Sequence, residues 1–334
     1  MSPFGSPTGE HESAQREGGD QTGMHRIVVV GGSGFVGRYV VARLATDGHR
    51  VVVPTRRRET AKHLILLPTV DVVETDIHDP VALAALFSGA TAVVNLVGIL
   101  NEGNGATFAR AHTELARNVV AACKTADVTR LLHMSALNAE VAAPSQYLRT
   151  KGEAEQLVIA SGLRWTIFRP SVIFGSGDSF LSLFALLLRR LPVMVLGAPQ
   201  ARFAPIFIGD VAHCIVAAID DDLTVGARFD LCGPKVYTLL EIVRYVGEVT
   251  GAVRPIIPLG SSLSWLQAFV LEHAPGTLMS RDNLKSMSID NVCNCPFPAL
   301  FGIVPASLES VAPGYLAPAS RRSSFDAFRA NGGR

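Results

Sequence analysis

The segment Ile27-Val28-Val29-Val30-Gly31-Gly32-Ser33-Gly34-Phe35-Val36-Gly37 decides the fold of this chain. Its apolar run predicts a short buried strand, and the apolar periodicity that continues to Leu44 predicts a helix directly after the glycines. The glycines fit both G-x-G-x-x-G, at positions 32, 34 and 37, and G-x-x-G-x-x-G, at positions 31, 34 and 37. A strand, a glycine turn and a helix in this order indicate a dinucleotide-binding loop, and an ordinary strand-to-helix turn is the alternative.

Each glycine has a physical role in such a loop. Gly31 allows a sharp turn, Gly34 allows the backbone to approach a pyrophosphate, and Gly37 allows the helix to pack closely on the strand. The first turn of the helix then offers unpaired N–H groups and a partial positive charge to the phosphates. The loop residues that we expect to contact the cofactor are Gly31, Ser33, Gly34, Phe35, Val36 and Gly37.

Strand and helix patterns alternate after this loop. This alternation predicts βαβ units with right-handed crossovers, and therefore an α/β fold of the Rossmann type, a doubly wound parallel sheet with helices on both faces. In such sheets, ligands bind at the carboxyl ends of the strands. The predicted strands are 49–53, 70–74, 92–98, 130–134 and 165–169, and the predicted helices are 80–87, 107–126 and 147–161.

The predicted domain organisation follows from this pattern. We expect a dinucleotide-binding Rossmann core over residues 24–175, to which residues 206–232 return with a helix and a strand. Residues 176–205 and 233–334 form a smaller, mostly helical cap, where we expect the substrate site, and a tail. Residues 1–23 are rich in Gly, Ser, Glu and Gln and predict a disordered extension, with Met24 as an alternative start.

Bulk properties exclude some classes of protein. The net charge of the 334 residues is +1 and only 18% are charged, so we expect no nucleic-acid partner. Residues 180–188 form the longest apolar run, and it stops at Arg189-Arg190 well short of the ~18 residues that span a bilayer, so no transmembrane helix is predicted. The mean hydropathy of +0.30 fits a peripheral or complex-bound protein as well as a large buried sheet. The apolar segment 261–271 leaves the same choice between a core face and a membrane or partner contact.

The N-terminal residues and the cysteines bear on the cellular location. Residues 1–23 lack the apolar segment of a secretion signal, and their acidic residues argue against an import sequence. The five cysteines show no paired spacing, so we expect free thiols, a reducing compartment and no metal site. A cytoplasmic location is therefore expected, extended to the inner face of the cytoplasmic membrane if the protein is peripheral.

Tyr147 and Lys151 are four residues apart and so share one helix face, and Ser135 follows the strand that precedes this helix. These residue types suit proton transfer beside a nicotinamide. The lysine cation favours phenolate and is expected to lower the pKa of Tyr147, which exchanges a proton with a substrate oxygen that Ser135 binds. The alternative is a surface Tyr and Lys that share a helical spacing without a catalytic role.

The end of the second strand bears on the choice of cofactor. NAD sites generally place an acidic residue there to bind the ribose 2′-hydroxyl, whereas this chain has Thr55-Arg56-Arg57-Arg58. A guanidinium suits a 2′-phosphate, so NADP(H) is favoured over NAD(H), with Arg56 as the expected contact and a solvated basic loop as the alternative. Asp76 and Ile77 are expected to flank the adenine. Asp210 and His213 could form a catalytic pair, but we do not include them among the site residues because Asp210 is predicted to be a helix N-cap.

Together these motifs resemble an atypical short-chain dehydrogenase/reductase. The resemblance covers about residues 25–330 and extends to the Rossmann-type accessory subunit of respiratory complex I and to bacterial epimerase/dehydratase-like relatives. It implies that Val97, Gly98 and Pro170 also contact the dinucleotide, together with Tyr147 and Lys151. The motifs that carry it are the glycine loop, Asn95–Gly98, Ser135, Tyr147–Lys151, Arg169–Gly175, Gly177–Phe180, Pro205–Val211 and Arg281–Leu284.

The resemblance implies two functions. The first is an NAD(P)(H)-dependent oxidoreductase or epimerase that acts through Ser135, Tyr147 and Lys151 on a carbonyl or sugar-type small molecule. The second is a non-catalytic NADPH-binding accessory or assembly subunit of the respiratory NADH:ubiquinone oxidoreductase, associated peripherally with that complex, in which Lys151 mainly binds the ribose. The intact triad favours the first function, and the full-length resemblance and apolar composition favour the second.

Overall fold

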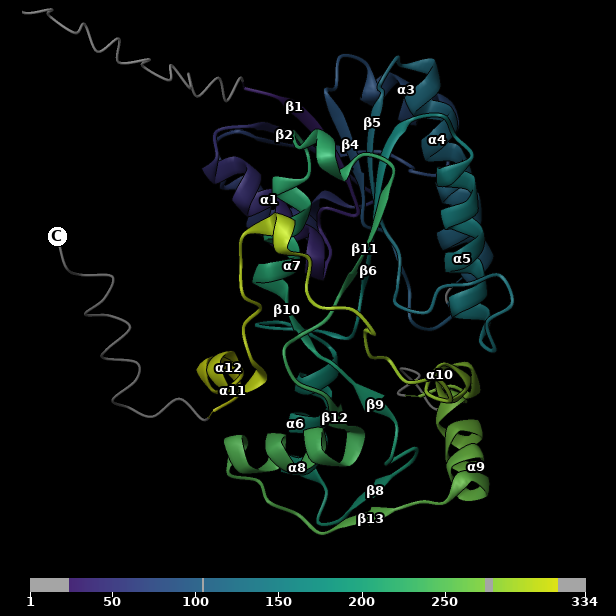
Figure 1. The fold of residues 1–334 in the computed structure, drawn as a ribbon, viewed down its shortest axis with the longest axis vertical. Helices are drawn as coiled ribbons and strands as arrows, with labels where there is room; N and C mark the ends of the chain where they lie inside the picture. The colour runs from purple at the N-terminus through teal and green to yellow at the C-terminus, as the bar shows by residue number, and fades with distance from the viewer. Residues whose placement is uncertain (1–23, 104, 274–278, 318–334) are drawn as a thin grey trace, which may run out of the picture.

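A seven-stranded parallel sheet forms the centre of the computed structural model, which describes residues 24–103, 105–273 and 279–317 (Figure 1). The strand order is β11-β6-β5-β4-β1-β2-β3, and every neighbouring pair is parallel. The strands are β1 (Arg26–Val30), β2 (Arg50–Thr55), β3 (Val70–Glu74), β4 (Ala92–Asn95), β5 (Arg130–Met134), β6 (Arg164–Pro170) and β11 (Ala227–Leu231). The α/β prediction is confirmed, including the returning strand. The extension predicted over residues 1–23 lies outside the described residues.

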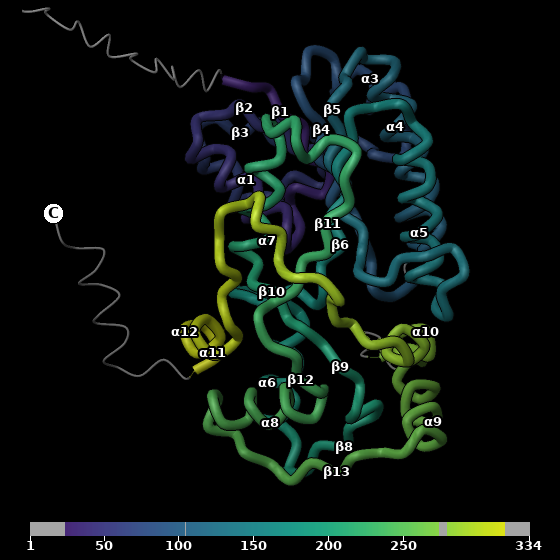
Figure 2. Tube along the Cα trace, viewed as in Figure 1, coloured from purple at the N-terminus to yellow at the C-terminus, as the bar shows by residue number. Residues whose placement is uncertain are grey.

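Helices cover both faces of the sheet, as expected for a doubly wound fold (Figures 1 and 2). Side chains of a strand alternate between the faces: in β1, Ile27 and Val29 join one apolar core, and Val28 and Val30 join the other. The helices of the first face are α1 (Phe35–Thr46) and α7 (Ile208–Ala217), and those of the second are α3 (Pro80–Phe87), α4 (Leu115–Thr125) and α5 (Gln146–Ile159).

A third apolar core lies in the cap, beyond the carboxyl edge of the sheet. It is centred on α6 (Phe180–Arg190) and α8 (Leu239–Thr250), and Leu181, Leu188 and Val246 are among its buried members. The remaining helices are η1 (Arg58–Ala61), α2 (Lys62–Ile65), η2 (Ala109–Glu114), η3 (Asp222–Thr224), α9 (Ser261–Glu272), α10 (Arg281–Ser286), η4 (Ala299–Phe301), α11 (Leu308–Val311) and α12 (Pro313–Leu316). Three short strand pairs lie outside the main sheet: β7 (Ile173–Phe174) with β10 (Ile206–Phe207), β8 (Met194–Leu196) with β13 (Ile256–Pro258), and β9 (Arg202–Phe203) with β12 (Tyr237–Thr238).

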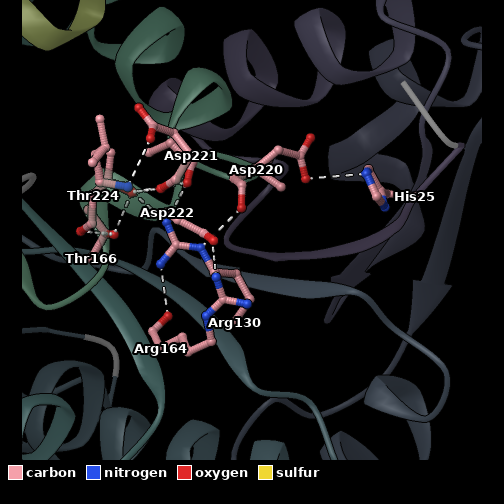
Figure 3. Close-up of polar contacts among 11 residues, drawn as sticks. His25, Arg130, Arg164, Thr166, Asp220, Asp221, Asp222 and Thr224 are labelled. Atoms are coloured by element: carbon pink, nitrogen blue, oxygen red, sulfur yellow. Dashed lines mark hydrogen bonds and ion pairs between the residues drawn. The ribbon is translucent and has the colours of Figure 1, made fainter. Parts of the chain in front are cut away.

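Arg130, at the start of β5, holds the amino edge of the sheet together (Figure 3). This buried guanidinium donates hydrogen bonds to the carbonyl of Ile219 after α7 (3.1 Å), to the carbonyl of Arg164 on β6 (2.8 Å) and to the hydroxyl of Thr224 (2.8 Å). A cation at a helix C-terminus satisfies carbonyls that the helix leaves unpaired. Arg130 therefore has a structural role at the edge remote from the glycine loop.

The expectation of free thiols is wrong for two cysteines, so the cysteines no longer support a reducing compartment. Cys232, directly after β11, forms a disulfide with Cys293, which lies 61 residues further along the chain. Cys123 and Cys214 are free and buried, and Cys295 is free and exposed. The two bonded residues meet because the chain returns from the cap to the end of β11, a long-range contact that cysteine spacing does not reveal.

The prediction that Asp210 is a helix N-cap is also wrong. Helix α7 begins at Ile208, after the N-cap residue Phe207, so Asp210 lies inside the first turn. Its carboxylate accepts a hydrogen bond from the Ala306 amide (2.7 Å), and His213 Nε2 contacts the Phe301 carbonyl (2.9 Å). Both side chains attach the C-terminal segment to α7.

Among the described residues, none of the helices combines the length and apolar character that crossing a bilayer requires.

Candidate functional site

The glycine loop joins β1 to α1 in the conformation that its sequence predicts. Gly31 has a φ of 84°, in the left-handed region that favours glycine. A Cβ atom at Gly37 would lie 2.3 Å from the Gly31 carbonyl oxygen, so only glycine permits this approach of helix to loop. Helix α1 begins after Gly34 with no side-chain cap and no acidic residue in its first turn. Its first N–H groups can therefore bind an anion, and the residues present fit a dinucleotide diphosphate.

The end of β4 lies beside this loop. A Cβ atom at Gly31 would lie 3.1 Å from the Val97 amide nitrogen, and one at Gly98 would lie 3.0 Å from Lys151 Nζ. The fold thus brings the loop, Val97, Gly98 and Lys151 to the carboxyl edge of the sheet. Pro170 is buried at the end of β6, where its carbonyl accepts a hydrogen bond from the Leu137 amide.

Lys151 bridges the ends of two strands. Its ammonium donates hydrogen bonds to the carbonyl oxygens of Val97 (3.2 Å) and Met134 (3.0 Å). Ser135 follows Met134 and is 3% exposed, and its Oγ has no hydrogen-bond partner within the described part of the chain. A buried unpartnered hydroxyl is costly unless a ligand satisfies it, so Ser135 fits contact with a bound molecule.

Burial controls the proton affinities of Tyr147 and Lys151. It raises the pKa of Tyr147 to about 12 and lowers the pKa of Lys151 to about 8, the latter against the opposing effect of Glu155. The expectation that Lys151 lowers the pKa of the phenol is therefore wrong for this arrangement, because desolvation dominates. At neutral pH, Tyr147 carries its proton and Lys151 is mostly charged.

His112 is a residue of this site that the sequence did not identify. It lies in the π-helix η2 (Ala109–Glu114), and its ring stands edge-on to Tyr147 with centroids 5.5 Å apart. The Ile99 amide donates to Nε2 (3.2 Å), so Nδ1 carries the hydrogen and donates to Thr150 Oγ1 (2.9 Å). Burial and the Lys151 cation lower the pKa of His112 to about 2, which keeps the ring neutral.

The position of His112 has a recognisable local cause but no sequence motif. A π-helical turn adds a residue to the helix and changes the direction of its side chains, and such turns are frequent at functional sites. Here it interrupts the single helix predicted over residues 107–126. The contact joins residues 38 positions apart, so no local pattern could reveal it.

Helix α10 of the cap packs against α5, the helix that carries Tyr147 and Lys151. The Asp282 carboxylate accepts hydrogen bonds from the backbone amides of Gln146 (2.7 Å) and Tyr147 (3.0 Å), at the start of α5. A carboxylate at this point pairs with N–H groups that the helix leaves free and with the positive end of its dipole. Asn283 donates to the Leu100 carbonyl (3.0 Å), next to the Gly98 loop.

The residues that are predicted to contact the adenosine part of the cofactor lie at the ends of two adjacent strands. Arg56 is exposed directly after β2, and Asp76 and Ile77 follow β3, which pairs with β2 through the Thr55–Glu74 register. Asp76 is exposed, its carboxylate accepting the His78 amide (3.0 Å), and Ile77 packs against the core. The structure thus brings these residues to the same edge as the glycine loop. Their contact with an adenosine stays a prediction.

A Rossmann sheet, a glycine loop and a Ser–Tyr–Lys constellation at its carboxyl edge define an NAD(P)-binding protein of the atypical short-chain dehydrogenase/reductase type. Residues 31–178 match the NAD(P)H-binding family model. The chain is 32% identical to NADH dehydrogenase (ubiquinone) 1 alpha subcomplex subunit 9, a mitochondrial protein of Mus musculus, over 84% of this chain and 77% of that protein. It is 31% identical to the ceramide reductase of Caulobacter vibrioides, over 70% of this chain and 73% of the relative.

The chain belongs to the family of NAD(P)H-binding, short-chain dehydrogenase/reductase-like proteins that includes both relatives. The fold also matches a solved nucleoside-diphosphate-sugar epimerase from Staphylococcus aureus. That match has a TM-score of 0.67 and 18% identity, and it covers 85% of this chain and 98% of the other.

Proposed function

We propose that this protein is an NADP(H)-dependent oxidoreductase or epimerase that acts on a carbonyl or sugar-type small molecule. The observation that carries the proposal is the buried Ser135 hydroxyl, which has no hydrogen-bond partner among the described residues. Ser135 follows Met134, whose carbonyl accepts a hydrogen bond from Lys151. The glycine loop, Val97, Gly98 and Lys151 would hold the dinucleotide. A bound nicotinamide supplies hydride transfer.

The proton chemistry belongs to the chain itself. In carbonyl reduction, Ser135 donates a hydrogen bond to the substrate oxygen, and the O–H bond of Tyr147 breaks as an O–H bond forms on that oxygen. The pKa of Tyr147, about 12, keeps the phenol protonated at neutral pH and ready to donate. The Lys151 cation stabilises the phenolate that remains. His112 and Thr150 keep the Tyr147 helix and the Ile99 loop in register.

Tyr147→Phe separates catalysis from binding. The variant lacks only the hydroxyl, so we expect it to abolish turnover across a panel of carbonyl and nucleotide-sugar substrates. Its affinity for NADPH, measured by cofactor fluorescence, should stay within about twofold of the wild type because stacking and burial are kept. Turnover at the wild-type rate would refute the catalytic role of Tyr147.

NADP(H) preference is tested at Arg56. Loss of a charge-assisted contact to the 2′-phosphate should weaken NADPH binding by about tenfold or more in Arg56→Gln and leave NADH binding unchanged. Arg57→Gln is the matched control, because the neighbouring arginine is exposed as well. Tighter binding of NADH than NADPH by the wild type would remove the basis of the assignment.

The second candidate function is a non-catalytic NADPH-binding accessory or assembly subunit of the respiratory NADH:ubiquinone oxidoreductase. The similarity to NADH dehydrogenase (ubiquinone) 1 alpha subcomplex subunit 9, over 77% of that protein, supports this candidate. In either role we propose a cytoplasmic location, at the inner face of the cytoplasmic membrane for the accessory subunit. Membrane fractionation with salt washes, followed by native electrophoresis, distinguishes the two: co-migration with a respiratory complex and no turnover favour the subunit.

A further inference from the structure

Helix α9 presents its large apolar side chains to solvent. Ser264 and Ala268 are its fully buried residues, and this small side of the helix is hydrogen-bonded to the chain in and just after β8. Ser264 Oγ accepts a hydrogen bond from the Ala198 amide (3.2 Å), and the Gln267 side chain donates to the Val195 carbonyl (2.8 Å). The large side chains are exposed by 39–58%: Leu263, Trp265, Leu266, Phe269 and Val270. An ordinary surface helix buries its large apolar side chains, so the arrangement in α9 is the reverse.

The exposed apolar surface continues beyond the helix. Strands β8 and β13 and their flanking loops lie with α9 at the end of the molecule remote from β1 (Figure 1). Single exposed apolar residues are ordinary, whereas a gathering of this kind marks an interaction surface. We call the set the distal apolar face: Leu191, Val193, Val195, Val253, Ile257, Leu263, Trp265, Leu266, Phe269 and Val270.

The charges around the distal apolar face are mainly positive, although Glu248, near the end of α8, is exposed just before residue 251. Residues 181–200 and 251–273 contain a single acidic residue, Glu272, and its carboxylate is paired with Arg281 at 2.8 Å. The guanidinium of Arg281 also lies 5.2 Å from the Phe269 ring centroid. Arg190 and Arg254 are exposed in the same segments. An apolar surface bordered by cations complements a surface that combines apolar and anionic groups.

We propose that the distal apolar face docks on an anionic phospholipid surface, with α9 lying in the plane of the interface. Trp265 suits this place because its indole combines an apolar body with an N–H donor, and tryptophan is favoured where apolar and aqueous media meet. Leu266 and Val270 would enter the acyl boundary, and Arg190 would contact lipid phosphates. The inference goes beyond the proposed function because it needs neither a bound dinucleotide nor a respiratory complex.

Vesicle flotation tests the docking surface with the full chain. The protein should float with mixed phosphatidylcholine–phosphatidylglycerol vesicles and much less with phosphatidylcholine alone. Leu266→Ser combined with Val270→Ser should weaken partitioning about tenfold or more, and Arg190→Gln about fivefold, the latter only with the anionic vesicles. The matched control is Leu223→Ser combined with Val304→Ser, because both residues are more than 75% exposed elsewhere on the surface. Unchanged NADPH affinity and thermal midpoint show that the variants are folded.

Trp265 gives an independent readout. Vesicles with brominated acyl chains should quench its fluorescence, and Trp265→Phe should remove the quenching. The proposal fails if neither vesicle type binds, or if binding survives the Leu266/Val270 double substitution. It fails equally if the protein self-associates in analytical ultracentrifugation and that double substitution abolishes only the self-association, because the face then belongs to a second copy of the chain.

Discussion

The ammonium of Lys151 donates hydrogen bonds to the strand-end carbonyls of Val97 and Met134, and burial disfavours its positive charge. The pKa of this lysine falls from 10.5 to about 8 in the folded chain. Between these values the unfolded chain binds a proton that the folded chain has lost, so stability rises with pH. Below pH 8 the folded protein carries the full cost of a buried cation.

Lys151→Met tests this linkage. The stability of the wild type relative to the variant should rise by about 3 kcal/mol from pH 8 to pH 10.5, at about 1.4 kcal/mol per unit. Urea unfolding of both proteins across this range measures the difference. A difference that does not change with pH would mean that Lys151 keeps its ordinary pKa.

His112 is expected to affect the free energy of unfolding at acidic pH. Its pKa falls from 6.5 to about 2, so the unfolded chain binds a proton below pH 6.5 that the folded chain does not, and stability is lost as pH falls. His112→Gln should remove this part of the acid loss. From pH 6.5 to pH 5 the wild type should lose about 2 kcal/mol more than the variant. Equal acid limbs in urea unfolding would contradict a buried neutral ring, and His63→Gln, on the surface of α2, is the control.

Among the elements, α5 depends on a partner from the far end of the chain. Helix α10 supplies Asp282 to the first amides of α5, and Ser145 adds the ordinary N-cap by accepting the Leu148 amide. Two short elements that are distant in sequence therefore define the direction in which α5 presents Tyr147. A site assembled in this way is sensitive to the cap as well as to the Rossmann core.

Asp282→Asn measures that dependence. Loss of the charge at the helix start should lower the free energy of unfolding by about 1 kcal/mol. Asp290→Asn is the control, because that carboxylate forms an exposed ion pair with Arg202 at 3.1 Å. Thermal and urea unfolding give the stabilities. A larger loss in Asp290→Asn than in Asp282→Asn would contradict the capping role.

At the scale of the whole molecule, the Cys232–Cys293 bond joins the end of the sheet to the chain that returns from the cap. Cross-linking residues 61 apart restricts the unfolded chain. Cys232→Ser combined with Cys293→Ser should therefore lower the free energy of unfolding by about 2–4 kcal/mol, as should a reducing agent on the wild type. Cys295→Ser, at an exposed free thiol, should change little. Titration of five thiols instead of three in the denatured, unreduced protein would show that the bond does not form.

Local chemistry made much of the fold and site predictable. The glycine loop, the alternating strands and the Ser135, Tyr147 and Lys151 set follow from short-range pattern, and the structure brings them to one edge. Features that depend on contacts between distant parts of the chain are not predictable in this way. They are the hydrogen bond between His112 and Thr150, the hydrogen bond from the Tyr147 amide to Asp282, and the disulfide. The pKa of Tyr147 was misjudged because its burial is a property of the packed molecule, whereas its spacing from Lys151 is local.

The position of β11 has a consequence for biosynthesis. This strand follows β6 only after residues 171–226, so during translation β6 is made long before β11 can pair with it. Until then the nascent sheet has an open apolar edge, where a strand of another chain can add. Ribosome-bound or prematurely terminated products that stop ahead of Ala227 are accordingly the species that need chaperones, and the finished polypeptide covers that edge itself.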